Sequence, residues 1–105
     1  MDTLVRIKRL VIKGAIRYTA KAVDEMKADE IFPRDVVESI MNATAIAKTL
    51  SSRNPVRPEI KERLYVIKSP NLDGTPIYTK GKIEQEGGQE YFYVLISAKI
   101  DTDIF

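Results

Sequence analysis

The residue types that could do chemistry in this chain are tyrosine, lysine, arginine and the carboxylates, because the sequence contains no histidine and no cysteine. Without histidine the commonest general base and metal ligand is absent, and without cysteine there are no disulfides, zinc thiolates or thiol nucleophiles. Phosphoryl transfer within RNA remains open to such a chain without a metal. It needs a base, an acid and a cation at the phosphate, which Glu, Tyr and Lys or Arg can supply.

Four of the five tyrosines lie between residues 65 and 93, together with Lys80 and Lys82. If this part forms an antiparallel sheet, one face carries rows of phenols beside ammonium and guanidinium groups. Aromatic rings stack on bases and cations neutralise phosphates, so this Tyr/Lys face is a candidate platform for single-stranded RNA. The candidate catalytic residues are Tyr65, Lys82, Tyr93, Glu84 and Arg63. The candidate RNA-binding residues are Lys80, Tyr78, Tyr91, Arg53, Arg57 and Lys21.

The catalytic set can be given roles. Tyr65 and Tyr93 can donate a proton, and Lys82 between them can neutralise charge at a phosphate. Glu84 beside Arg63 can act as a base, although such a pair is also an ordinary cross-strand ion pair. The same face could equally be a solvated sheet surface, or a protein interface such as that of a dimer.

Three segments rich in Tyr, Ile, Val and Phe predict the strands that would carry this face. They are residues 63–69, 76–84 and 89–100, separated by the turn signals Asp73-Gly74 and Gly87-Gly88. We expect a two-residue hairpin loop at each turn. That register pairs Ile83 with Phe92 on an apolar face and places Tyr65, Lys82 and Tyr93 in one row on the opposite, open face.

Three helices are predicted to precede the strands, over residues 3–13, 19–30 and 33–43. Gly14 stands where a C-terminal capping glycine belongs, Thr19 is a natural N-cap, and Pro33 suits a first helical turn. Residues 45–51 favour a short strand over a continuation of the third helix. Residues 52–59, with two prolines and two arginines, favour an extended basic loop.

The length of 105 residues allows one domain, spanning 1–105. Amphipathic helices and a one-sided sheet each need a partner layer. The sequence therefore predicts an α+β domain in which three N-terminal helices pack on one face of a three- to four-stranded antiparallel sheet.

No segment approaches the roughly 20 apolar residues of a membrane span, so we expect a cytoplasmic protein with no membrane partner. The basic amphipathic segment 1–21 could alternatively lie on an anionic membrane surface. Acidic residues in the second helix could hold Mg²⁺, but a solvated acidic helix face is the simpler interpretation. These residues are Asp24, Glu25, Asp29 and Glu30. We expect no metal and no cofactor.

A family resemblance adds to this interpretation. The segment from Ile16 to Ile40, IRYTAKAVDEMKADEIFPRDVVESI, resembles the signature of a small bacterial domain family of unknown function. In that signature Ser or Thr precedes a His-Ala pair and a Met-containing helix, and a later helix opens with Asp-Val. The segments LYVIKSPNLDGTPIYTKGKI and YFYVLISAKI resemble the sheet of the same family.

That family is similar to the RelE and MqsR superfamily of toxin ribonucleases. The resemblance implies a RelE-like fold with RNA on the open face of the sheet, cleavage of messenger RNA, and neutralisation by an antitoxin protein. Lys21 stands where the signature has His. The activity is altered if that His takes part in the chemistry, and unaffected if it only anchors the helix.

Two hypotheses follow. The first is a metal-independent, toxin-type endoribonuclease of the RelE/MqsR kind, controlled by an antitoxin. The second is a non-catalytic, dimeric module that binds protein or RNA through the same Tyr/Lys face.

Overall fold

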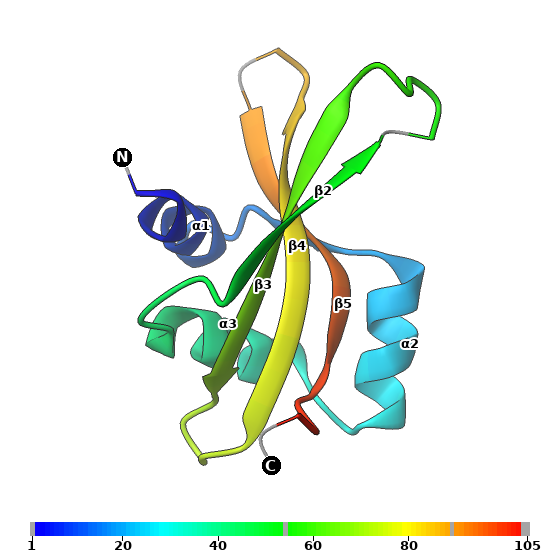
Figure 1. Ribbon diagram of the computed structural model, residues 1–105. Helices are drawn as coiled ribbons and strands as arrows, with labels where there is room; N and C mark the ends of the chain where they lie inside the picture. The colour runs from blue at the N-terminus through cyan, green and yellow to red at the C-terminus, as the bar shows by residue number, and fades with distance from the viewer. Residues whose placement is uncertain (1, 54, 89, 104–105) are drawn as a thin grey trace.

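A computed structural model describes residues 2–53, 55–88 and 90–103, and Figure 1 shows a layer of helices behind a twisted sheet. The helices are α1 (Thr3–Ile12), α2 (Ala20–Ala28) and α3 (Pro33–Asn42). The strands are β1 (Ile16–Tyr18), β2 (Lys48–Arg53), β3 (Lys61–Pro70), β4 (Pro76–Glu86) and β5 (Glu90–Ile100). They form one sheet in the order β1-β5-β4-β3-β2.

The three predicted helices are present, and their ends use the predicted residues. Gly14 has a φ of +84°, and the amide of Ala15 donates to the carbonyl of Leu10 at 2.9 Å, which closes α1 in a Schellman motif. The side chain of Thr19 accepts from the amide of Ala22 at the start of α2. Pro33 occupies the first turn of α3.

The apolar side of α1 is buried in the core through Leu4, Ile7, Leu10 and Val11. It is therefore unavailable to a membrane surface, contrary to the alternative left open for residues 1–21. The described residues contain no helix long and apolar enough to cross a bilayer.

The predicted arrangement of three N-terminal helices on an antiparallel sheet is wrong. The sheet has five strands and is mixed, because β1 lies between α1 and α2 in the chain and pairs in parallel with β5. Residues Ile16–Tyr18 do alternate apolar and charged side chains, but three residues are too few for a period of two to stand out in a sequence.

Helix α2 runs beside β5 and covers the lower part of its outer edge (Figure 1). The carboxylate of Glu25 accepts from the amide of Ala98 at 3.2 Å, and that of Asp29 accepts from the amide of Ile100 at 2.8 Å. Acidic residues of α2 thus satisfy backbone donors at a sheet edge that would otherwise be open.

The register differs from the predicted one by a single residue in the first hairpin and in the outer part of the second, and by two residues beyond the register shift between Lys80 and Gly81 of the second. Tyr65 pairs with Gly81 instead of Lys82, and Ile83 pairs with Tyr93 instead of Phe92. Because side chains alternate between the two faces of a strand, this slip moves every side chain of β3 and of the first half of β5 to the face opposite the predicted one. The face predicted for β4 is confirmed.

The slip comes from loop length. Three residues, Leu72 to Gly74, lie between the paired Asn71 and Thr75, where a two-residue loop was expected. The amide of Gly74 donates to the carbonyl of Asn71, and Gly74 itself has a φ of +84°, so the turn over residues 71–74 ends on a left-handed glycine. The second hairpin likewise has three residues between the paired Glu86 and Glu90.

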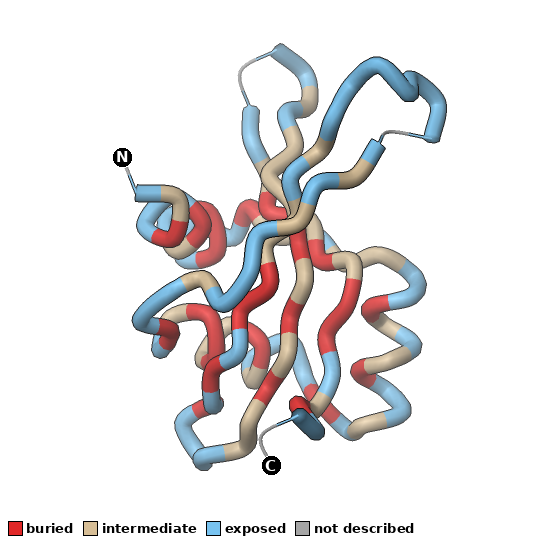
Figure 2. Tube along the Cα trace, viewed as in Figure 1, coloured by how far each residue is buried: buried red, intermediate tan, exposed pale blue. Residues whose placement is uncertain are grey.

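The predicted strand at 45–51 corresponds to β2, shifted to Lys48–Arg53. Asn54 of the predicted loop and Gln89 at the predicted start of the last strand lie outside the described residues. Figure 2 shows buried residues concentrated where the helices meet the sheet, while the β2–β3 and β4–β5 hairpins project beyond the helices and stay largely exposed.

Candidate functional site

The predicted Tyr/Lys face does not form, because its residues lie on two different faces of the sheet. Lys82 and Glu84 of β4 lie on the open face, away from the helices. Tyr65, Tyr93 and Arg63 lie on the face that α1 and α3 cover. The structure therefore does not bring the five candidate catalytic residues together into one site.

Tyr93 is fully buried and cannot reach a substrate. Its ring lies against Gly81, where an added Cβ would come within 2.6 Å of the ring carbon Cζ. Burial, and next the nearby phenol of Tyr65, raise the pKa of Tyr93 above its ordinary value. Its hydroxyl has no hydrogen-bond partner. Tyr93 is a core residue whose ring fills the space that Gly81 leaves.

On the open face, Lys82 is held by two carboxylates. Its ammonium lies 3.1 Å from the carboxylate of Glu62 and 3.3 Å from that of Glu84. Partial burial alone would lower the pKa of Lys82, but the hydrogen bond and charge of Glu62, helped by Glu84, outweigh it and raise the pKa. Lys82 is thus a charged group already neutralised by its neighbours.

The other open-face candidates lie further along β4. Lys80 points to the same side as Lys82 and pairs in register with Val66 and Ser97. Tyr78 lies near the far end of the strand, with the ammonium of Lys99 5.3 Å from the centre of its ring.

Three further RNA-binding candidates lie outside β4. Arg53 ends β2 and donates to the carbonyl of Pro58 at 2.9 Å. Arg57 lies in the loop that follows, 3.9 Å from Glu59. Lys21 lies on α2, where its ammonium is 3.9 Å from the carboxylate of Glu25 in an i,i+4 pair. Helix α2 packs against β5 and β1, at the end of the sheet opposite to β2.

A basic groove forms on the helix-covered side, where the two hairpins diverge (Figure 1). The pairing of β3 with β4 begins only at Tyr65, so the outer parts of the two strands separate. The hollow between them and α1 has a volume of about 400 Å³. Its lining residues are Arg6, Lys61, Arg63, Tyr65, Ile83, Gln85 and Tyr91.

The basic groove is positively charged. Its lining contains three cations, Arg6, Lys61 and Arg63, and no carboxylate among the described residues. The guanidinium of Arg6 lies 4.8 Å from the centre of the Tyr91 ring, so α1 contributes a cation stacked on an aromatic surface. Of the predicted residues, the groove unites Arg63, Tyr65 and Tyr91.

Arg6 and Lys61 were missed from the sequence as site residues. The signal for Lys61 was present, because Lys61, Arg63 and Tyr65 alternate along one strand and must share a face. Arg6 lies in the basic amphipathic segment 1–21, and nothing in the sequence pairs it with Tyr91, 85 residues later.

The acidic residues of α2 do not form a metal site. Glu25 and Asp29 are engaged with the edge of β5, and the hydrogen bonds to Glu25 from Ser97 and Ala98, with the charges of Lys21 and Lys99, outweigh burial and lower the pKa of Glu25. Within the described residues no group of three acidic side chains is arranged to hold a metal ion.

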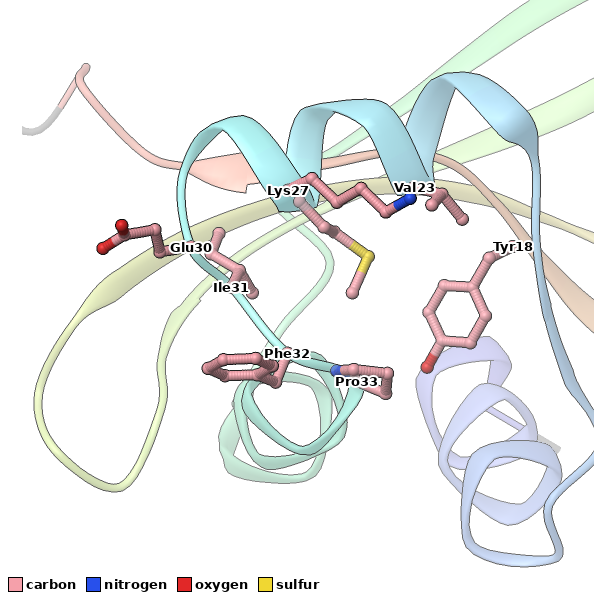
Figure 3. A pocket seen from close by; sticks show the side chains of 8 residues that line it. Tyr18, Val23, Lys27, Glu30, Ile31, Phe32 and Pro33 are labelled. Atoms are coloured by element: carbon pink, nitrogen blue, oxygen red, sulfur yellow. The ribbon is translucent and has the colours of Figure 1, made fainter.

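A larger hollow, about 600 Å³ and mainly apolar, lies between α2, the end of β1 and the start of α3 (Figure 3). Tyr18 closes one end, Phe32 and Pro33 form one wall, and Val23 and Lys27 of α2 lie on the opposite wall. Most of its lining is apolar, and Tyr18, Lys27 and Glu30 are the lining residues that carry polar groups. We find no match for this chain among protein-family models, curated protein sequences or solved structures.

Proposed function

We propose that the protein binds single-stranded RNA in the basic groove. The observation that carries the proposal is the lining of the groove, where Arg6, Lys61 and Arg63 surround two tyrosines with no carboxylate among the described lining residues. Unneutralised cations attract a phosphate backbone, and nearby aromatic rings offer surfaces on which unpaired bases stack.

The position of the groove fits a flexible strand. The two hairpins project beyond the helices, so a chain can enter between them without displacing core residues (Figure 2). Tyr91 is 38% exposed and Tyr65 is partly buried, so one ring is open to a base while the other forms part of the floor.

Binding of a labelled twelve-nucleotide single-stranded RNA tests this proposal. Removing the two guanidinium groups with Arg6→Ala/Arg63→Ala is expected to weaken binding by at least about tenfold, because each charge-assisted phosphate contact contributes roughly 1 kcal/mol or more. The dependence of affinity on salt should also become shallower by about 0.7 per lost phosphate contact.

The matched control is Lys80→Ala/Lys99→Ala, which removes the same charge from the open face. We expect its affinity to stay within about twofold of the wild type, because net charge alone has a small effect at moderate salt. Equal losses in the two double variants would contradict the assignment of RNA to the groove. Circular dichroism of each variant checks that the fold is retained.

Cleavage of the bound RNA is a second candidate, as the family resemblance implies. It is favoured by the shared position of Tyr65 and Arg63 in the groove. There the 2′-oxygen would attack the phosphorus and give its proton to solvent water, while the phenol protonates the leaving 5′-oxygen and the guanidinium stabilises the phosphorane. RNA incubated with the protein in EDTA should then be cut by the wild type and not by Tyr65→Phe. Cutting at an equal rate by both would reject Tyr65 as the acid.

A further inference from the structure

The free edge of the sheet is β2, six residues from Lys48 to Arg53. It pairs with β3 on one side, and the strand order leaves its other side without a neighbouring strand among the described residues. Four of its six residues are exposed and the other two are half-buried. An edge of this kind presents backbone donors and acceptors on which a further extended chain can pair.

The charges of β2 argue against a second copy of this chain as that partner. Lys48 and Arg53 stand at its two ends. Pairing β2 with a second copy of itself would bring four cations and no carboxylate of β2 together along one strand pair. Like charges close to each other in a strand pair are destabilising, so the edge disfavours pairing with itself.

A hollow beside this edge adds a feature that selects side chains. It lies on the open face, has a volume of about 430 Å³, and includes Leu50 and Val66 in its lining. Lys48 and Lys68 also line it, against one acid, Asp103. In a strand added to an edge, every second side chain points to the same face. One such side chain would reach this hollow, where two ammonium groups favour a carboxylate above an apolar floor.

We propose that β2 accepts an extended acidic segment of another protein as a sixth strand. Backbone pairing along β2 supplies affinity, and carboxylates facing Lys48 and Lys68 on the open face select the partner and its register. The edge is separate from the basic groove, because Lys48 and Lys68 lie on the open face. The proposal therefore does not depend on RNA binding.

A capped nine-residue peptide in which Glu alternates with Val is the probe. We expect it to bind the full chain with a Kd of about 10–100 μM at low salt and to slow hydrogen exchange of the β2 amides. The same peptide with proline at its centre keeps the charge but cannot pair continuously, and should bind at least about tenfold more weakly. A peptide with Lys in place of Glu should not bind.

Charge reversal on the protein locates the site. Lys48→Glu/Lys68→Glu should weaken binding of the acidic peptide by at least about tenfold. The matched control, Lys13→Glu/Lys27→Glu, reverses two exposed charges on α1 and α2 and should change it by less than about twofold.

Four results would overturn the proposal. One is equal affinity for the acidic peptide and its proline form, and another is equal loss in the two charge-reversal variants. The third is a dimer at micromolar protein concentration, with the β2 amides protected before any peptide is added. Protection of these amides by the twelve-nucleotide RNA instead of the peptide would assign the edge to nucleic acid and would also count against it.

Discussion

The two diverging hairpins have a hollow on each side, and the two hollows differ in charge although they share four residues. Lys61, Arg63, Ile83 and Gln85 line both. On the helix-covered side, Arg6 and two tyrosines complete the lining. On the open side, the lining also contains Lys82 and the two carboxylates that neutralise it, Glu62 and Glu84. The comparison teaches that counting cations on a sheet does not locate a polyanion site. What matters is whether carboxylates accompany them.

The largest expected effect tests how tightly the helix-covered side is packed around Tyr93. Gly81→Ala places a Cβ within 2.6 Å of the ring of Tyr93, a side chain that is fully buried in the core. We expect a loss of about 2–3 kcal/mol in the free energy of unfolding, measured by urea denaturation. An unchanged midpoint would mean that the ring can move and that this side is looser than described.

The second effect tests the ion pairs of the open side. Lys82→Ala leaves Glu62 and Glu84 without their shared cation, and should cost about 1–2 kcal/mol of stability. Lys80→Ala, on the same face of β4, should cost less than about 0.5 kcal/mol. RNA affinity should change by less than twofold in both. A Lys82→Ala variant that bound RNA as poorly as an Arg63→Ala variant would remove the distinction between the two sides.

A third, smaller effect separates a core role for Tyr93 from a chemical one. Its buried hydroxyl has no hydrogen-bond partner, so Tyr93→Phe removes an unsatisfied polar group. We expect the variant to be about 1 kcal/mol more stable than the wild type, with RNA binding and any RNA cleavage retained. A variant of equal fold that lost cleavage would restore the catalytic role predicted from the sequence.

The smallest effect concerns Glu25 of α2, which is hydrogen-bonded to the edge of β5. Glu25 has a lowered pKa, so its contribution to stability is present above its ordinary value of 4.5 and is lost as the pH falls through the lower folded value. Glu25→Ala should cost about 0.5–1 kcal/mol near pH 7 and less below pH 4. Urea denaturation at both pH values measures the difference. A cost that did not shrink in acid would point to lost packing as its cause.

The positions of the helices and strands could be predicted from the sequence better than the face of the sheet on which each strand side chain lies. The three helices could be predicted because Gly14, Thr19 and Pro33 are local signals that act where they stand. The face of β4 could be predicted from its own alternation. The faces of β3 and β5 could not, because they depend on whether each loop holds two residues or three.

In the first hairpin the deciding residue is Asn71. Its side-chain oxygen accepts from the amides of Asp73 and Thr75 at 3.0 and 2.8 Å, which supports a three-residue loop around the same Asp73-Gly74 pair that suggests a two-residue one. The additional loop residue moves the side chains of β3 to the other face of the sheet, so Tyr65 and Arg63 are separated from Lys82 and Glu84. The groove itself also needed α1, whose Arg6 meets Tyr91 only through the tertiary fold.

The central claim is that RNA contacts the helix-covered side of the diverging hairpins, and photocrosslinking tests it most directly. A twelve-nucleotide RNA carrying 4-thiouridine would be irradiated with the protein and the adducts mapped by mass spectrometry. We predict adducts on Tyr65 and Tyr91, which line the basic groove. Adducts confined to Tyr78 and Phe92, or to peptides of β2, would contradict the account.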